Sequence, residues 1–270
     1  MNEIIDSSGR ELVKSQTQQN EQILKSDIQL PWVLLQQGLS DFVSEGKAQM
    51  GDMVNSMTGE KLGDKSKPIE FIPLTMKNSW VLSEKIGNKY EYRKTLPRDS
   101  GLRDGKDPLE MTGESLPWDF VHNGLPWKRT KVITVYAVLV KDIVGFLEEV
   151  KKAQETGDFD LDKALMPYAI GFRSTSYNAG KKVSTQFAKA QAMAAYGAKP
   201  YTNTMMLGCH MQKNDQGTFY VYDVTPGRKC TKDEIEQAAS LYKVVTSGNV
   251  KTHDIDTGAP EESASLSDEY

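Results

Sequence analysis

The stretch of sequence that decides the fold runs from residue 167 to residue 225: PYAIGFRSTSYNAGKKVSTQFAKAQAMAAYGAKPYTNTMMLGCHMQKNDQGTFYVYDVT. Its first nine residues put Tyr168, Ile170 and Phe172 on one face of a strand, with small residues on the other. An alanine-rich helix is predicted over 182–196, closed by a glycine at position 197. Strands at 201–211 and 218–225 follow. The stretch therefore predicts a strand, a helix and a pair of strands.

The neighbouring segments add strands before this stretch and a helix after it. The run VITVYAVLV (132–140) is continuously apolar, as a buried strand is, and a helix over 142–155 follows with Asp142 as its N-cap. The segments PIEFIPLTM, NSWVLSEKI and KYEYRK, which begin at Pro68, are predicted as three short strands. Glycines punctuate the region before Pro68, which predicts hairpin-like or irregular structure. Thr231 and Glu234 form a capping box for a last helix ending near residue 246.

This order of elements predicts a mainly β fold with α additions. Several short strands, one helix between the later strands and a closing strand pair are typical of an OB-fold-like, partly open five-stranded barrel, here with inserted helices and long loops. An α+β sandwich gives a similar order and stays an alternative. The expected organisation is a mobile N-terminal arm (1–27), an OB-like nucleic-acid-binding domain with insertions (28–250) and a disordered acidic tail (251–270).

Composition places the chain in the cytoplasm, that of the host cell if a phage encodes it. Its 270 residues have a mean hydropathy of −0.53 and 26% charged side chains. The longest apolar run is far too short to span a bilayer, and the first residues lack the pattern of a signal peptide. Two cysteines fit a reducing compartment without a disulfide framework. No membrane association is expected.

The sequence contains no recognisable active site. Residues 175–182 resemble a phosphate-binding loop, but Thr175 replaces its first glycine and Lys182 replaces the magnesium-binding hydroxyl. No serine lies in a G-x-S-x-G elbow, and three histidines leave little room for a catalytic triad. The residue types that zinc prefers lack paired spacing. We therefore expect no enzymatic activity, no cofactor and no metal; the zinc candidates set aside are Cys209, His210, Cys230 and His253.

Local charge points instead to binding. Residues 166–232 contain nine Lys and Arg but only two acidic residues, and aromatic side chains are interspersed among the cations. Single-stranded nucleic acid requires both, because cations neutralise phosphates and exposed rings stack on unpaired bases. Rings on strands are nevertheless more often part of a core. The predicted nucleic-acid-binding residues are Arg173, Tyr177, Lys181, Lys182, Tyr220, Tyr222, Trp127, Lys128, Arg129, Tyr92 and Lys94.

The last seventeen residues, DIDTGAPEESASLSDEY, carry six carboxylates and no Lys or Arg. Such a segment buries almost no apolar area and repels itself, so it is predicted to be disordered. A polyanion beside a basic body can compete with nucleic acid for the binding groove or recruit partner proteins. A merely solubilising terminus is the alternative. The predicted partner-binding residues are Asp268, Glu269 and Tyr270.

A basic, aromatic-bearing barrel followed by an acidic tail with an aromatic end resembles the single-stranded DNA-binding proteins of phages and bacteria. The resemblance covers the elements of 68–225 and the ending SLSDEY, with Tyr270 where Phe is expected; residues 1–67 have no counterpart. It implies protection of single-stranded DNA in replication, recombination and repair, and recruitment of polymerase, helicase or primase by the tail. The alternative is a protein-interaction or structural phage factor, such as a transcription co-activator or virion component.

Overall fold

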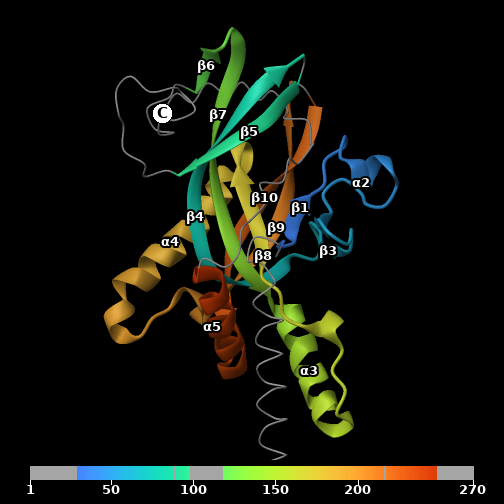
Figure 1. Cartoon of the computed structure of the whole chain (residues 1–270), viewed down its shortest axis with the longest axis vertical. Coiled ribbons are helices and arrows are strands. Elements are labelled where there is room, and N and C mark those ends of the chain that lie inside the picture. Colours follow the sequence, from blue (N-terminus) through green and yellow to red (C-terminus); the bar gives the residue numbers. More distant parts are fainter. Residues whose placement is uncertain (1–28, 88, 98–117, 216, 248–270) are drawn as a thin grey trace, which may run out of the picture.

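The computed structural model describes residues 29–87, 89–97, 118–215 and 217–247 (Figure 1). The expected arm over 1–27, the acidic tail and its residues Asp268, Glu269 and Tyr270 lie outside the described residues. The elements are β1 (Trp32–Leu35), α2 (Asp41–Ser44), β2 (Met53–Asn55), β3 (Lys61–Gly63), β4 (Ile69–Ile86), β5 (Lys89–Pro97), β6 (Asp119–His122), β7 (Leu125–Leu139), α3 (Val140–Thr156), η2 (Leu161–Lys163), β8 (Tyr168–Arg173), η3 (Ser174–Ser176), α4 (Tyr177–Ala192), η4 (Ala194–Tyr196), η5 (Pro200–Thr202), β9 (Asn203–Asn214), β10 (Gly217–Lys229) and α5 (Lys232–Thr246).

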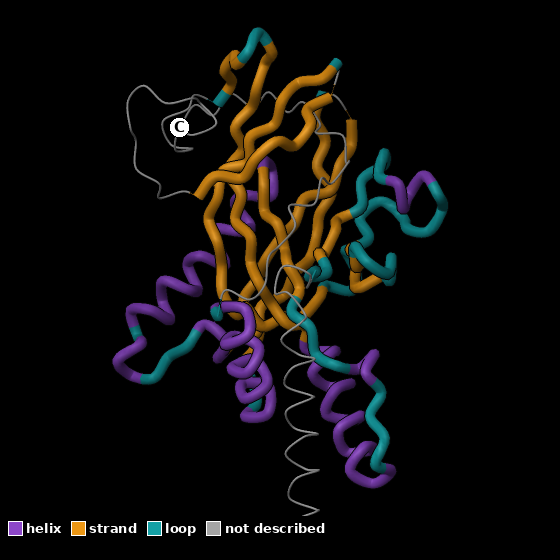
Figure 2. The backbone as a smooth tube through the Cα atoms, in the orientation of Figure 1, coloured by secondary structure: helices purple, strands orange, loops and turns teal. Residues whose placement is uncertain are grey.

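One mixed sheet dominates the molecule, and the prediction of a mainly β chain with few helices is confirmed. The strand order is β10-β9-β4-β7-β8-β1-β2-β3, with β5 added to β4 and β6 added to β7. Strand β1 runs parallel to β8, and the other pairs are antiparallel. The sheet has ten strands where five were expected, and the OB barrel is not confirmed. In Figure 2 the longer helices gather around the lower half of the molecule, and the upper half is built mainly of strands, with the short helix α2 at its side.

The long strand β4 joins the two halves. We expected two strands divided near Lys77, but residues 69–86 form one strand that pairs with β7 over most of its length. Its other edge pairs with β9 at its start (69–71) and with β5 at its end (79–86). The register shifts between Pro73 and Thr75. A proline is tolerated in a strand at such an irregularity, because one ladder hydrogen bond is already lost there.

The main core lies on one face of this sheet, which we call the core face. Ile133 and Val135 of β7 lie beside Ile170 and Phe172 of β8, and helix α4 packs on them. Gly180 permits this close contact, since a Cβ at that position would lie 2.8 Å from the Phe172 Cβ and 3.1 Å from the Ile133 Cβ. Helix α4 begins at Tyr177, five residues before the predicted start. Gly197 closes the following turn in the left-handed conformation, as expected.

Helices α3 and α5 cover the lower part of the other face, where Ile72 and Val138 meet Ile143 and Leu241. Helix α3 matches the predicted helix over 142–155, but its N-cap is Leu139. Asp142 lies instead in the first turn, where a negatively charged carboxylate interacts favourably with the helix dipole. Burial raises the pKa of Asp142 above its usual value. The prediction of Asp142 as the capping residue is therefore wrong.

Hydrogen bonds close the seam between β10 and three neighbouring segments, which are β1, the residues just after it and η3. The Gln37 amide nitrogen donates to the Tyr220 carbonyl (2.8 Å), and the Tyr220 N–H donates to the Gln37 Oε1 (2.9 Å). The Ser176 hydroxyl accepts the Tyr222 N–H at 3.1 Å, and the Tyr222 hydroxyl donates to the Val33 carbonyl at 2.8 Å. These bonds satisfy backbone groups at the edge of β10 that would otherwise be open to another strand.

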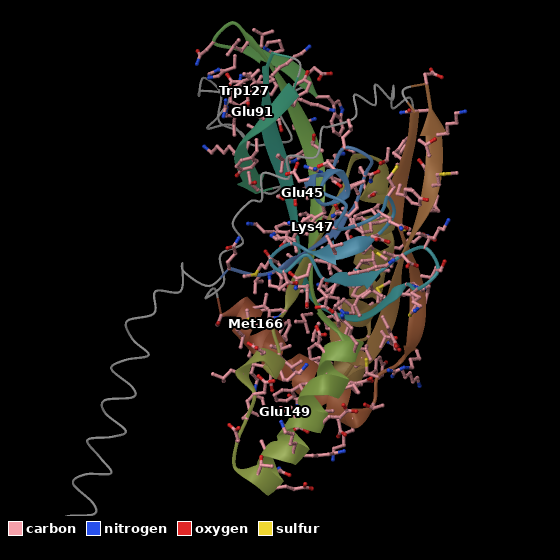
Figure 3. The ribbon with its side chains drawn as sticks, turned by 90° about the vertical axis from the view of Figure 1, so that its right-hand side faces the viewer. Glu45, Lys47, Glu91, Trp127, Glu149 and Met166 are labelled. Carbon is pink, nitrogen blue, oxygen red and sulfur yellow. The ribbon has the colours of Figure 1, made fainter. Side chains whose placement is uncertain are left out.

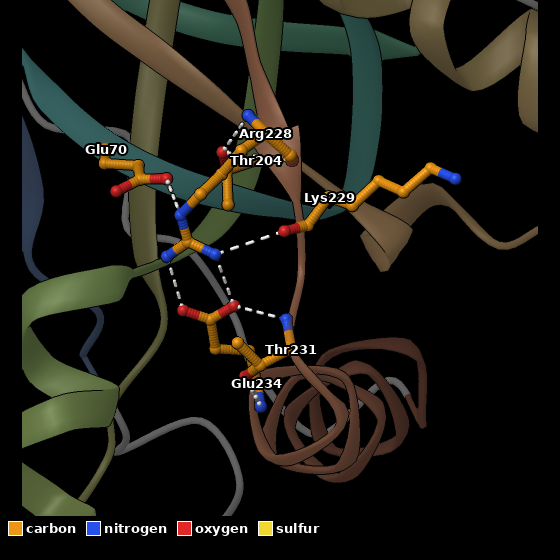
Figure 4. Close-up of polar contacts among 6 residues, drawn as sticks. All are labelled: Glu70, Thr204, Arg228, Lys229, Thr231 and Glu234. Carbon is orange, nitrogen blue, oxygen red and sulfur yellow. Dashed lines mark hydrogen bonds and ion pairs between the residues drawn. The ribbon is translucent and has the colours of Figure 1, made fainter.

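An arginine bridge ties α5 to the sheet (Figure 4). The Arg228 guanidinium donates to both carboxylate oxygens of Glu234, at 2.9 and 2.6 Å, and its Nε lies 3.0 Å from the Glu70 Oε1. Glu234 also accepts the Thr231 N–H at 2.7 Å, while the Thr231 hydroxyl accepts the Glu234 N–H. The predicted capping box at the start of α5 is therefore confirmed.

Candidate nucleic-acid interface

The upper half of the sheet carries a face with hydroxyl groups and cations. Directly opposed residues in a sheet share a face, and alternate residues along a strand return to it. The pairing aligns Tyr92, Ser83 and Lys128 in one row across β5, β4 and β7, and Ser79, Val132 and Arg173 in another across β4, β7 and β8. We call this surface the polar face; its residues are Lys77, Ser79, Val81, Ser83, Tyr92, Asp119, Lys128, Thr130, Val132, Thr134, Gly171 and Arg173.

Small side chains form the middle of the polar face and longer ones lie among them. Ser79, Ser83, Thr130 and Thr134 are buried, whereas Lys77 is exposed and Tyr92, Lys128 and Arg173 are partly exposed. The Thr130 hydroxyl has no hydrogen-bond partner among the described residues. From the row of Lys128 to the row of Thr134 the strand advances by about 20 Å. The face therefore combines a buried row of small hydroxyl side chains with three cations, a tyrosine and one exposed carboxylate, Asp119, in the row of Lys128.

Cations lie close to aromatic rings on the upper parts of β4, β5 and β7. The Lys128 ammonium lies 5.7 Å from the Tyr90 ring centroid. On the reverse side, the Arg129 guanidinium carbon lies 4.0 Å from the Trp80 ring and 4.8 Å from the Trp118 ring. Such cation–π contacts hold both partners in a fixed geometry. The upper strands thus hold a partly exposed cation, Lys128, on the polar face and a buried one, Arg129, on the reverse side.

Two of the predicted binding residues lie on the reverse side and are buried. Trp127 is 4% exposed and packs with Trp80, Leu82 and Leu96 in a small core of the upper strands. Arg129, 6% exposed, lies between two tryptophan rings. Figure 3 shows Trp127 among these upper strands. Neither side chain is available as an exposed platform in this structure. Lys94 belongs to the same side by its pairing with Leu82, and it is exposed.

The predicted residues of β10 and α4 form a separate group around the start of α4. Tyr222 is buried in the main core, and burial raises the pKa of its hydroxyl above the usual range. Tyr220 is partly buried. Its ring packs against Gly51 so closely that a Cβ on Gly51 would lie 2.7 Å from the nearest ring carbon. Tyr222 is therefore a core residue in this structure and is not available for stacking, and Tyr220 is largely committed to the seam.

The cations at the start of α4 are exposed. The Lys181 ammonium lies 5.3 Å from the ring of Tyr177, which packs against the core at the helix start. Lys182 forms an ion pair of 2.6 Å with Asp223, and this contact lowers the pKa of that carboxyl. Lys182 is therefore partly neutralised, and the start of α4 offers less positive charge than its sequence indicates. Of the predicted set, the pairing brings together Arg173, Lys128 and Tyr92, and it leaves the others elsewhere.

Three features of the polar face were not found from the sequence. Lys77 was placed between two predicted strands, and Thr130 lay before the predicted start of its strand. Trp32 belongs to β1, which was not predicted; its ring lies 3.1 Å from the position of a Gly171 Cβ, next to the polar face. Period-two geometry was the available signal, because it places Lys128, Thr130, Val132 and Thr134 on one face of a strand, although the residues between them include the cations Arg129 and Lys131.

Other predicted chemistry is scattered through the fold. Cys209 is buried, and burial raises the pKa of its thiol to about 11. Within the described ranges, no three His, Cys, Asp or Glu side chains are grouped so that they could hold a metal ion. No helix in the described part of the chain is long and apolar enough to cross a membrane.

Comparison with known proteins identifies a phage family. The model of the Pam3 phage gp34-like proteins matches residues 9–89 and 158–251, which together make up more than half of the chain. The chain belongs to this family of Pam3 phage gp34-like proteins, which indicates a phage protein. The matched segments contain β1 to β4 and β8 to α5, including Lys77 and Arg173 of the polar face. Neither a curated protein nor a solved structure matches the chain.

Proposed function

We propose that this phage protein binds single-stranded DNA without sequence specificity, through the polar face, and protects it during phage replication, recombination and repair. In this proposal the chain is not an enzyme and works in the host cytoplasm. Its acidic C-terminal tail recruits replication proteins such as polymerase, helicase or primase. The observation that carries the proposal is the alignment of Lys128, Arg173 and Tyr92 around a row of small hydroxyl side chains.

The chemistry of this face suits a single strand. Lys128, Arg173 and Lys77 supply positive charge for phosphates, and Tyr92 supplies a ring on which an unpaired base can stack. None of these contacts reads a base edge, so binding would be tolerant of sequence. The hydroxyl side chains between them are buried, so contacts to phosphate would be made by the exposed ends of the cations.

The strand order supports an OB-like arrangement within the larger sheet. Strands β4, β7, β8, β9 and β10 follow one another with α4 between the third and the fourth, and β4 pairs with both β7 and β9. We propose that these five strands are an elaborated OB barrel, in which β1 lies parallel to β8. OB folds bind oligonucleotides on their second and third strands and the adjoining loops. Those two strands would be β7 and β8, which carry Lys128, Thr130 and Arg173.

The test replaces two cations of the polar face. The Lys128→Gln/Arg173→Gln variant should bind oligo-dT more weakly, and its log–log salt slope should be smaller by about 1.4, at about 0.7 per phosphate contact. The matched control is Lys65→Gln/Lys243→Gln, which removes two exposed cations from β3's turn and from α5 and should leave the slope unchanged.

A second variant separates two locations for the DNA. If the strand instead crosses the start of α4, Lys181→Gln/Lys182→Gln will lower the slope and the polar-face variant will not. That result would reject the polar face and retain DNA binding. If wild-type protein does not bind oligo-dT at low salt, the proposed function is wrong, and the protein-interaction or structural factor becomes the better hypothesis.

A further inference from the structure

Helix α4 ends in an exposed patch that combines positive charge with large apolar side chains. Lys189 and Met193 are one helical turn apart, and the following turn contributes Tyr196. Met193 is 50% exposed and Tyr196 is 83% exposed, and both lysines of the patch are exposed. No ion pair engages Lys189 or Lys199 within the described residues. We call Lys189, Met193, Tyr196 and Lys199 the cationic patch.

The end of α3 and the adjoining η2 carry a patch of the opposite sign. Glu155 is on the last turn of α3, and Asp158, Leu161 and Asp162 follow it. Leu161 is 81% exposed, and the three carboxylates are exposed as well. In the described part of the chain these carboxylates form no ion pair. We call Glu155, Asp158, Leu161 and Asp162 the acidic patch.

We propose that the two patches are complementary halves of one interface, through which the acidic patch of one copy contacts the cationic patch of a second copy of this chain. Each patch has a charged rim and an exposed large side chain, Leu161 on one and Tyr196 on the other. An aromatic or aliphatic anchor surrounded by charges is the usual anatomy of a protein interface. Opposite charges add orientation and speed of association more than affinity.

The placement of the patches favours association between copies over a contact within one. Figure 1 shows α3 and α4 projecting from different sides of the lower half of the molecule, with α5 between them. A contact between unlike patches leaves one patch of each kind unused at the ends of a dimer, so further copies can add. Both patches are on the helical end, and the polar face is on the upper strands. Assembly of several copies through these two patches would therefore leave the polar face uncovered.

Charge reversal with restoration tests the proposal in the absence of DNA. Sedimentation velocity of the full chain at low salt should show association that increases with protein concentration and disappears at high salt. Glu155→Lys/Asp158→Lys, which makes the acidic patch positive, should weaken self-association by at least about tenfold. Lys189→Glu/Lys199→Glu, which makes the cationic patch negative, should weaken self-association by a similar factor. Lys65→Glu/Lys243→Glu changes the net charge by the same amount and sign as Lys189→Glu/Lys199→Glu, at exposed sites outside both patches, and should associate as the wild type does.

Two combinations then distinguish complementary patches from a general effect of charge. An equimolar mixture of the two patch variants should associate again, because each supplies the partner sign that the other requires. A single chain carrying all four substitutions should also regain self-association. A wild-type protein that stays monomeric at every concentration at low salt would overturn the proposal. Patch variants that associate like the wild type, or a mixture that stays monomeric, would overturn it too.

Discussion

The arginine bridge at the start of α5 allows a quantitative prediction about stability. Replacing Glu234 with alanine removes both hydrogen bonds from Arg228, at 2.9 and 2.6 Å, and the bond from the Thr231 N–H at 2.7 Å. It also leaves Arg228 with Glu70 as its remaining carboxylate partner. Because Glu234 is only 5% exposed, water does not readily replace these bonds.

The loss can be estimated from its parts. Losing the half of the capping box that Glu234 supplies, its bond from the Thr231 N–H, costs about 0.5–1 kcal/mol, because the Thr231 hydroxyl still caps the helix. Hydrogen bonds to a charged group contribute about 1.5–3 kcal/mol, and the lower end applies here because Arg228 is partly exposed. Glu234→Ala should therefore lower the free energy of unfolding by about 2–3 kcal/mol. Glu234→Gln keeps an acceptor for the Thr231 N–H and should lose about half as much. For a domain of this size the alanine variant should melt about 5–10 °C lower.

The assay is urea unfolding followed by circular dichroism, with Glu236→Ala as the matched control. Glu236 is on the same helix but is exposed, so its removal should change the unfolding free energy by less than about 0.5 kcal/mol. A loss below this value for Glu234→Ala would refute the reasoning, because the bridge would then contribute nothing beyond a surface charge. Equal losses in both variants would indicate a general effect of charge on α5.

The same bridge has a defined pH dependence. Hydrogen bonds from Arg228 lower the pKa of Glu234 below its usual 4.5. A carboxyl with a depressed folded pKa contributes stability above its unfolded pKa and loses it as pH falls through the folded value. The difference in stability between wild type and Glu234→Gln should stay constant at neutral pH and shrink on acidification below the usual carboxyl range. A difference that grows on acidification would contradict this assignment.

Three further predictions follow from single contacts. Gly180→Ala places a Cβ 2.8 Å from the Phe172 Cβ, so it should destabilise the fold by about 1–3 kcal/mol in urea despite the better helix propensity of alanine; a stabilised variant would show that α4 can move away. Gln37→Ala should speed amide exchange at Tyr220 by at least about tenfold, because the seam loses both bonds to that residue; unchanged exchange would mean that packing alone closes the seam. Cys209, with a thiol pKa of about 11, should react with iodoacetamide at mildly alkaline pH far more slowly in the folded than in the urea-unfolded protein, and equal rates would show an open site.

Elements with local signals were predicted well from the sequence. Helix α5 has its capping box, α4 is followed by Gly197, and the strands of 201–225 have a turn between them. The antiparallel pair of β2 and β3 agrees with the hairpin-like structure expected before Pro68, but β1, β2 and β3 were not predicted as individual strands because each has only three or four residues. Their existence depends on partners distant in sequence, as the parallel pairing of Trp32 with Ala169 illustrates. No local pattern reports such a pairing.

Local sequence patterns also indicate only part of the candidate site, because its residues come from strands that are distant in sequence. Period-two alternation already implied that Lys128 faces away from Trp127 and Arg129, so the three could not share one surface. The sequence alone therefore places Lys128 and its two neighbours on opposite faces of one strand, and the structure agrees. The meeting of Lys128, Tyr92 and Arg173 on one face, in contrast, follows only from the register of four strands. That register depends on a sheet topology that local patterns do not encode.

The central claim is tested most directly by titrating the wild-type protein with oligo-dT and with duplex DNA over a range of salt concentrations, with tryptophan fluorescence as the signal. Trp32 lies against Gly171 beside the polar face and is placed to report binding there. The account predicts quenching by oligo-dT that weakens steeply with salt, with much less response to duplex. It also predicts that Trp32→Phe removes much of this signal without weakening binding measured by gel shift. No binding of oligo-dT at low salt, or equal binding of duplex, would contradict the account.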